Sequence, residues 1–285
     1  MMHISLIIGT LSTAVLLRLI LTHRCLENAQ WLSVLSLLIV SPVLLLTTAL
    51  AIVIMGPHGH MVNPVADWLS YGVAWSFLGI SLAMLAHLGW QAYISIQNVQ
   101  QYPENLVQGT PSRIMELDTV FSAQIGLWSS ELVLSQGLIN SLDGSHLAAV
   151  IAHEKAHSYY RDTFWFFWLG WLRRLTQWLP YTDKLWQELL LLREIRADNR
   201  AKRSVDPITL AEALVQVIAA PLSPVTTVNF SCTAPKSRLS CRIDALLSEH
   251  KHNYGFDHQW SAMTYSYIAS MVLSLFPLCS IPFHY

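Results

Sequence analysis

Charged side chains are scarce in this chain of 285 residues: only 12% are Asp, Glu, Lys or Arg, whereas 53% are hydrophobic. A soluble domain usually carries about twice that share of charge. The formal net charge is -1, so the chain lacks the basic excess that a nucleic-acid-binding surface needs. The composition therefore predicts a membrane protein and argues against a nucleic-acid partner.

Cysteine is also rare, and its spacing does not suit metal binding. The four cysteines are Cys25, Cys232, Cys241 and Cys279, and none of them forms a C-x-x-C pair. We expect three of the four to lie in or near the reducing cytoplasm. The sequence therefore predicts neither disulfides nor a cysteine-bound zinc site.

Long apolar runs predict the membrane-spanning part. Four runs are long and apolar enough to cross a bilayer: Ile4–Leu21, Trp31–Met55, Trp68–Ile94 and Ala262–Phe283. The first lacks a basic start and a small-residue cleavage site, so we interpret it as a retained anchor and not as a signal peptide. We predict three transmembrane helices in residues 1–94, a protease domain in residues 95–259 and a last transmembrane helix in residues 260–285.

The distribution of basic residues predicts the orientation, because Lys and Arg accumulate in cytoplasmic loops. The loop between the second and third runs has neither residue, whereas Arg18 and Arg24 lie at the end of the first run. Nearly all the remaining basic residues lie between Arg113 and Lys251. We expect a multi-pass protein of the cell membrane whose large segment faces the cytoplasm.

The stretch AVIAHEKAHSYYRD, residues 149–162, places two histidines and a glutamate in an otherwise apolar run. One helical turn separates His153 from His157, so both project from one face, with Glu154 beside them. This H-E-x-x-H pattern is typical of zinc peptidases: two neutral imidazoles bind zinc, and the glutamate takes a proton from the attacking water. The alternative is a polar helix face without a metal.

A catalytic zinc ion normally has three protein ligands, so a third must lie elsewhere. In WQELLLLREIRADNRA, Glu194 and Asp198 share one face of a predicted helix. We predict that Glu194 binds the zinc and that Asp198 accepts the free ring N–H of a histidine ligand. Asp162 is a weaker candidate for the same supporting role. Taken alone, these acids also fit a solvated face beside neighbouring arginines.

The rest of the cytoplasmic segment reads as α+β. Residues 113–135 are rich in β-branched and aromatic residues and predict three short strands of a small sheet. The motif helix should begin near residues 143–145, where Asp and Ser can cap it. We expect residues 163–180 to form a helix that ends at Pro180. Its apolar part before Arg173 and Arg174 is too short to span, so we expect the helix to lie at the membrane surface or to dip into it. The fold class is thus a mainly α membrane protein with a zincin-like α+β protease domain.

ELVLSQGLINSL, HLAAVIAHEKAHSYYRD and REIRADNRA resemble the membrane metallopeptidases of the BlaR/MecR type, and the resemblance covers residues 121–247. These are gluzincins, in which a glutamate is the third zinc ligand. The resemblance implies an endopeptidase for regulated proteolysis or signalling, with a protein substrate such as a cytoplasmic repressor. It also implies that the sheet-edge strand, residues 120–127, pairs with substrate backbone. BlaR receptors carry an external penicillin-binding sensor after the last span. This sequence stops at Tyr285, so we do not expect it to sense β-lactams by itself.

Two other functions are still open. The HtpX and CAAX-protease family shares the H-E-x-x-H and E-x-x-x-D motifs and implies protein quality control. Those proteases typically place a His-Pro pair before a downstream arginine, but Ala234 stands at the histidine position here. The difference favours the BlaR/MecR type and leaves the oxyanion stabiliser unassigned, with Arg238 as a candidate. A non-catalytic scaffold is the other alternative, and the intact Glu154 argues against it. The sequence does not decide whether the chain forms a homo-oligomer.

Six further histidines fit ordinary structural roles better than a second metal site. They are His58 and His60 in the outer loop, His87 in the third run, and His250, His252 and His258 before the last run. We interpret them as turn, bundle and juxtamembrane polarity, respectively.

Overall fold

The computed structural model describes residues 2–27, 30–57, 64–219, 238–248, 269 and 271–283. The chain divides into two compact units. The first comprises residues 1–87, 169–189 and 253–285, and the second comprises residues 88–168 and 190–252. Residues 169–189, which the sequence analysis assigns to the protease domain, thus group with the membrane helices.

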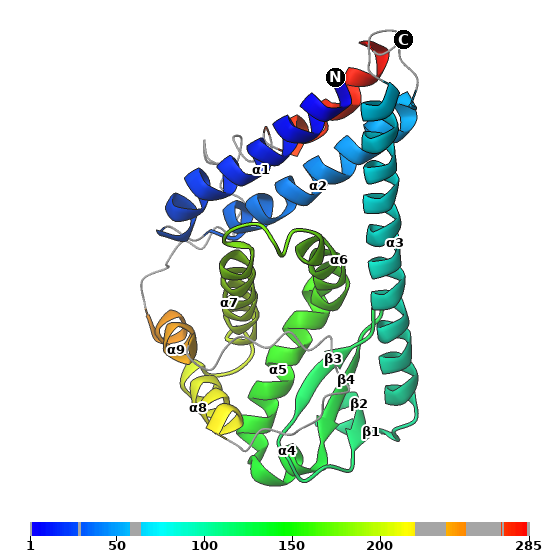
Figure 1. Ribbon diagram of the computed structural model, residues 1–285. Helices are drawn as coiled ribbons and strands as arrows, with labels where there is room; N and C mark the ends of the chain where they lie inside the picture. The colour runs from blue at the N-terminus through cyan, green and yellow to red at the C-terminus, as the bar shows by residue number, and fades with distance from the viewer. Residues whose placement is uncertain are drawn as a thin grey trace. The chain divides into compact units, whose positions relative to one another are not determined.

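The long helices at the start of the chain are α1 (Met2–Glu27), α2 (Trp31–Met55) and α3 (Pro64–Gln100) (Figure 1). All three contain a stretch that is long and apolar enough to cross a membrane, as the first three runs predict. Residues 262–268 and 270 of the predicted fourth span lie outside the described residues, and the structure does not confirm this span. Its described end forms a short 3-10 helix, η2 (Phe276–Phe283).

The first unit packs its helices through small and branched side chains. Ala49 and Ile52 of α2 meet Ala74 of α3 in a buried cluster, which partly buried residues of α1 and η2 complete. Arg18 of α1 is fully buried and donates to the Ser41 hydroxyl (3.1 Å) and to a backbone carbonyl of α2 (3.3 Å). These partners offset the cost of placing a charge within an apolar span.

The sheet of the second unit has four strands in the order β1-β2-β4-β3. They are β1 (Glu104–Val107), β2 (Thr110–Met115), β3 (Ser122–Ile125) and β4 (Glu131–Ser135). The β1–β2 and β3–β4 pairs are antiparallel, and β2 and β4 are parallel. The sheet is therefore mixed, and β3 is an edge strand.

Strands β2, β3 and β4 correspond to the three predicted strands, but β1 was not predicted. Its residues are mostly exposed, so no alternation of apolar and polar residues marks it. A two-residue turn joins it to β2, and Gln108 and Gly109 both have positive φ (49° and 72°). Such a turn suits a tight hairpin, but Gln-Gly is a weaker turn signal than Asn-Gly.

The two faces of the sheet are covered by different helices. Leu132 and Leu134 of β4 point into the core formed with α5 and α8. Val133 points the other way, where Ala123 and Ile125 of β3 pack with Val99 of α3. The alternation of buried side chains along β4 thus fixes which face of β3 turns toward α5.

Six further helices lie within residues 136–247, in the part of the chain that the structure describes. They are α4 (Gln136–Ser141), α5 (Gly144–Tyr160), α6 (Asp162–Leu175), α7 (Thr182–Ala201), α8 (Pro207–Ala219) and α9 (Leu239–Leu247). Asp143 caps α5 by accepting from the backbone N–H groups of Ser145 and His146, both at 2.9 Å, which confirms the predicted start of the motif helix. The predicted end of α6 at Pro180 is wrong, because a tight turn follows Leu175.

Candidate metal centre

Helices α5 and α7 bring together the three predicted ligands. The Nε2 atoms of His153 and His157 are 3.1 Å apart. The Glu194 carboxylate lies 3.4 Å from the first of these nitrogens and 3.7 Å from the second. Ligand atoms about 2.0–2.2 Å from a tetrahedral zinc ion are themselves about 3.3–3.6 Å apart. The spacing of these donors, and their nitrogen and oxygen chemistry, therefore fit zinc.

The Nδ1 atom of each histidine lies close to a carboxylate. Asp198 lies 2.8 Å from Nδ1 of His153, and Asp162 lies 2.7 Å from Nδ1 of His157. An Nδ1–H that donates to a carboxylate leaves Nε2 free as the metal-binding nitrogen. Asp162, the weaker candidate from the sequence, is thus as close to its histidine as Asp198 is.

The turn between α5 and α6 explains the position of Asp162. Arg161 adopts the left-handed conformation (φ 53°, ψ 44°), and its N–H bonds back to carbonyls at the end of α5. Holding a non-glycine residue there costs on the order of 1 kcal/mol. The Arg161 guanidinium lies over the Trp128 ring, 4.2 Å from its centroid, and this contact offsets part of the cost. The turn carries the chain back so that Asp162 faces His157.

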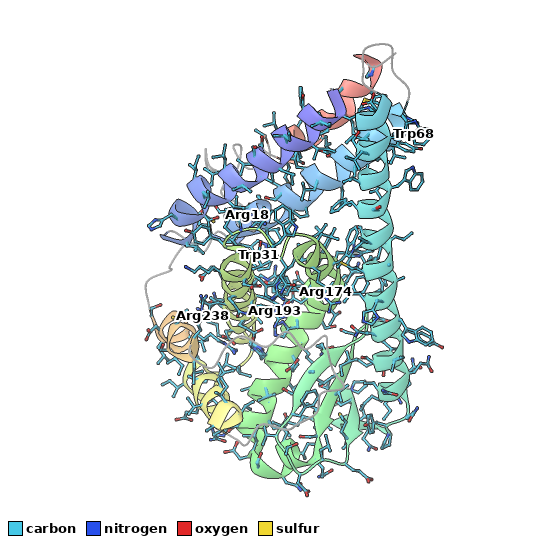
Figure 2. All side chains as sticks on the ribbon, in the orientation of Figure 1. Arg18, Trp31, Trp68, Arg174, Arg193 and Arg238 are labelled. Carbon is cyan, nitrogen blue, oxygen red and sulfur yellow. The ribbon has the colours of Figure 1, made fainter. Side chains whose placement is uncertain are left out.

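Arginines neutralise the acids of the site. Arg242 of α9 donates two hydrogen bonds of 2.8 Å to Asp198 and lies 3.3 Å from Glu194. Arg193, which projects from α7 in Figure 2, donates to Glu194 at 2.6 and 3.0 Å. Arg196 bonds to Asp162. Sequence reasoning missed these roles, although buried acids so close together require positive partners.

The arginine candidate from the sequence, Arg238, is the residue that precedes α9 (Figure 2). The arginine that reaches the acids is Arg242, one helical turn later. Residues four apart in a helix lie on the same face. A search for a basic residue four positions after Arg238 would therefore have found Arg242.

The electrostatics of the centre keep the buried carboxylates of Glu194 and Asp198 ionised. Burial raises the pKa of Glu194, but Arg193 and Arg242 outweigh it and hold this pKa well below its usual value. Burial likewise opposes ionisation of Asp198, yet Arg242 and His153 lower its pKa. Burial would lower the pKa of His153, but Asp198 and Glu194 raise it to about 9. Both carboxylates are therefore ionised at neutral pH, as a metal ligand and the acceptor of a histidine N–H must be.

Glu154, the predicted proton acceptor, is buried beside the histidines. The Ser122 hydroxyl donates to its carboxylate at 2.8 Å. Ser122 belongs to β3, so this bond ties the glutamate to the edge strand. No sequence signal singled out Ser122, because one serine in a strand is unremarkable by itself.

Part of the chain is similar to a known peptidase family. Residues 114–220 match the family model "Peptidase family M48". The matched segment contains the last two residues of β2, all of β3 and β4, both histidines, Glu154 and Glu194, whereas Arg242 lies beyond it. A search of curated proteins gives no match to this chain. The family match and the His153–His157–Glu194 group support a metallopeptidase of the M48 kind, and the three apolar helices indicate a membrane protein. The matching model says nothing of a BlaR/MecR type.

Among the other candidate positions, only His87 and Arg238 lie in the part of the chain that the structure describes. His87 ends the first segment of its unit, and it is not part of the metal-binding group that the described residues form. Ala234 and five histidines, at positions 58, 60, 250, 252 and 258, lie outside the described residues.

Proposed function

We propose that this chain is a membrane-embedded zinc endopeptidase that cleaves extended protein segments at the cytoplasmic face. The observation that carries the proposal is the joint placement of three metal-binding side chains, a buried glutamate and an open strand edge. A scaffold would need none of these. The cytoplasmic side is inferred from the distribution of basic residues.

The proposed chemistry follows from the contacts. His153, His157 and Glu194 would hold zinc, whose Lewis acidity polarises the scissile carbonyl and eases deprotonation of water. Glu154 would accept the proton of the attacking water and pass it to the leaving amine. The hydrogen bond from the Ser122 hydroxyl holds the carboxylate of Glu154 in place.

The edge strand supplies a place for the substrate. Ser135 donates its N–H to the carbonyl of Phe121 (3.0 Å), which makes this a hydrogen-bonded pair of the β3–β4 ladder. Such pairs alternate along antiparallel strands. The backbone groups of Ser122 and Gln124 therefore face away from β4, toward the open edge. An extended substrate could pair with them through its main chain.

Main-chain pairing predicts loose sequence preference, so access should decide which proteins are cut. We propose that the substrates are cytoplasmic regulators, such as a repressor, or flexible segments beside membrane spans, including this chain's own loops. Compactly folded domains should resist. This role in regulated proteolysis rests on the resemblance to BlaR/MecR peptidases.

The test begins with purified, zinc-loaded protein and fluorescein-labelled casein as an unfolded substrate. We expect cleavage by the wild type and none by Glu154→Gln with equal zinc content. Proteome-wide mapping of new N-termini in cells with either form would then name the substrates. Equal casein cleavage by both forms would refute the catalytic assignment. New N-termini in misfolded proteins generally, with none in a regulator, would favour the quality-control alternative.

A further inference from the structure

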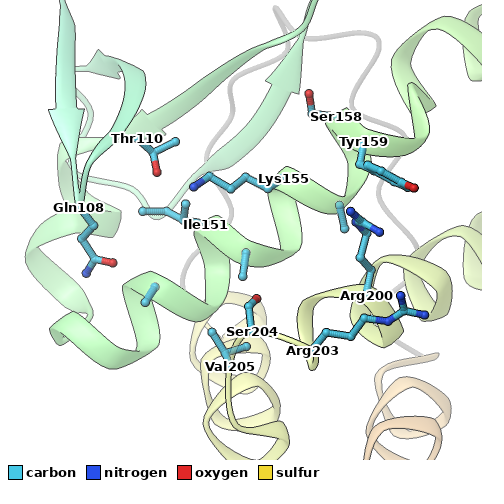
Figure 3. A pocket seen from close by; sticks show the side chains of 13 residues that line it. Gln108, Thr110, Ile151, Lys155, Ser158, Tyr159, Arg200, Arg203, Ser204 and Val205 are labelled. Carbon is cyan, nitrogen blue, oxygen red and sulfur yellow. The ribbon is translucent and has the colours of Figure 1, made fainter.

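A cavity lies against α5, on the face of this helix opposite to the two histidines of the metal centre. It has a volume of about 790 Å³, within the usual range of small-molecule sites. Its walls are α5, the β1–β2 hairpin and the end of α7 with the turn that follows (Figure 3). Lys155 of its lining is two residues from each of the metal-binding histidines and so projects from the opposite face of α5. The cavity is therefore separate from the metal centre.

The lining is positively charged. Lys155, Arg200 and Arg203 contribute to it, and no aspartate or glutamate does. This is a local excess, because acidic residues slightly outnumber Lys and Arg in the whole chain (18 against 17). Within the described part of the chain, Lys155 and Arg203 form no side-chain ion pair or hydrogen bond. Three cations without acidic partners fit an anionic ligand.

Among the three basic residues of the lining, Arg200 has a side chain that is held in place by aromatic rings. Its guanidinium lies on the Tyr159 ring, 3.2 Å from the centroid, and 5.8 Å from that of Tyr160. Stacking occupies the face of the guanidinium and leaves the N–H donors at its edge for a ligand. Lys155 and Arg203 are exposed, and Figure 3 shows that they extend from different walls. Their flexible side chains can therefore close on a bound anion.

A buried hydroxyl in the same cavity supplies independent support. Thr110 is only 8% exposed, and its Oγ1 has no hydrogen-bond partner among the described residues. Figure 3 shows its side chain on the same side of the cavity as the end of Lys155. A buried hydroxyl without a partner costs about 1–3 kcal/mol, and a ligand oxygen would remove that cost.

We propose that this cavity binds a phosphate-bearing anion. A single carboxylate would leave most of the positive charge uncompensated, whereas a phosphate monoester carries a charge of about -1.5 to -2 and three acceptor oxygens. Arginine suits phosphate because its N–H donors can bind two oxygens at once. Small and apolar side chains of α5, such as Ala148, Ile151 and Ala152, form a floor for the body of the ligand. The phosphate belongs either to a free molecule or to a lipid headgroup. This inference does not depend on the proposed peptidase activity.

The experiment uses the full, zinc-loaded chain in phosphatidylcholine nanodiscs. Binding of inorganic pyrophosphate is measured by titration calorimetry, and a second arm compares nanodiscs with and without phosphatidylinositol 4-phosphate for protection against thermal unfolding. Binding in the first arm identifies a free phosphate. Protection in the second arm alone identifies a lipid headgroup. A hexaglutamate peptide serves as the carboxylate probe.

Variants of the lining decide the outcome. The double variant Lys155→Gln/Arg203→Gln should weaken binding by at least about tenfold, because it removes two charge-assisted contacts. Thr110→Val should weaken it by about threefold to tenfold. Lys202→Gln, a matched loss of charge beside the cavity, should leave affinity unchanged, and zinc content reports folding in every variant. The proposal is overturned if no phosphate probe binds, if the double variant binds as the wild type does, or if hexaglutamate binds more tightly than either phosphate probe.

Discussion

Arg242 grips Asp198 through two parallel hydrogen bonds of 2.8 Å, and Asp198 in turn lies 2.8 Å from Nδ1 of His153. The arginine also lies 3.3 Å from Glu194. One guanidinium on α9 thus fixes the acid that contacts His153 and also contacts Glu194, and both of these residues are proposed zinc ligands. Helix α9 is therefore part of the metal centre, although the motifs that reveal the centre lie on α5 and α7.

Replacing this arginine should loosen the metal centre. We expect Arg242→Ala to reduce zinc affinity by about 10-fold to 100-fold, as is usual when a group that orients a ligand is lost. Removing one partner of a buried ion pair should also lower the stability of the second unit by about 3–5 kcal/mol. Competition with a chromophoric chelator measures the affinity, and chemical denaturation measures the stability.

Arg242→Lys is the matched control, because it keeps the charge but loses the two-pronged contact. It should recover part of the stability and little of the zinc affinity. Wild-type affinity in Arg242→Ala would show that Asp198 holds its position without the arginine.

The ligand assignment predicts that replacing Glu194 and replacing Glu154 have different effects on zinc content. Glu194→Ala should remove zinc from the purified protein, whereas Glu154→Gln should retain about one zinc per chain and lose peptidase activity. Metal content by atomic emission and cleavage of labelled casein give the two readouts. Zinc retained at full affinity in Glu194→Ala would rule out this residue as the third ligand.

The two supporting acids should have separable effects. Asp198→Ala and Asp162→Ala should each weaken zinc binding by about 10-fold to 100-fold without abolishing it, because each orients one histidine. The double variant should show close to the sum of the two losses, since the acids hold different ligands. Chelator competition across the four proteins tests this. An unchanged affinity in Asp162→Ala would limit that residue to starting α6 and pairing with Arg196.

The sequence was sufficient to predict those residues of the metal centre that follow helical spacing. His153 and His157 lie one turn apart, and Glu194 and Asp198 repeat the pattern, so a local rule predicts their shared faces. Ser122 and the arginine of α9 could not be predicted in this way, because their positions depend on how distant elements pack. The β1 strand was missed for a related reason: its exposed residues leave no apolar pattern to detect.

The orientation in the membrane can be tested directly. In a cysteine-free background, single cysteines at Asn63 and at Tyr285 should react with an impermeant thiol reagent applied to intact cells. A cysteine at Asp143 should react only after the membrane is permeabilised, because the distribution of basic residues predicts that this segment faces the cytoplasm. The reverse labelling pattern would put the metal centre outside the cell and remove cytoplasmic proteins from its substrates.

The edge-strand model makes the sharpest prediction about substrate binding. The backbone of Gln124 faces away from β4, so Gln124→Pro removes an N–H that the substrate could use without breaking a bond to β4. We expect the variant to fold, to hold zinc and to lose at least about tenfold in kcat/KM on labelled casein. Gln124→Ala keeps the N–H and should cleave at the wild-type rate, which separates the backbone from the side chain. If the proline variant binds zinc and cleaves as fast as the alanine variant, the substrate does not pair with β3.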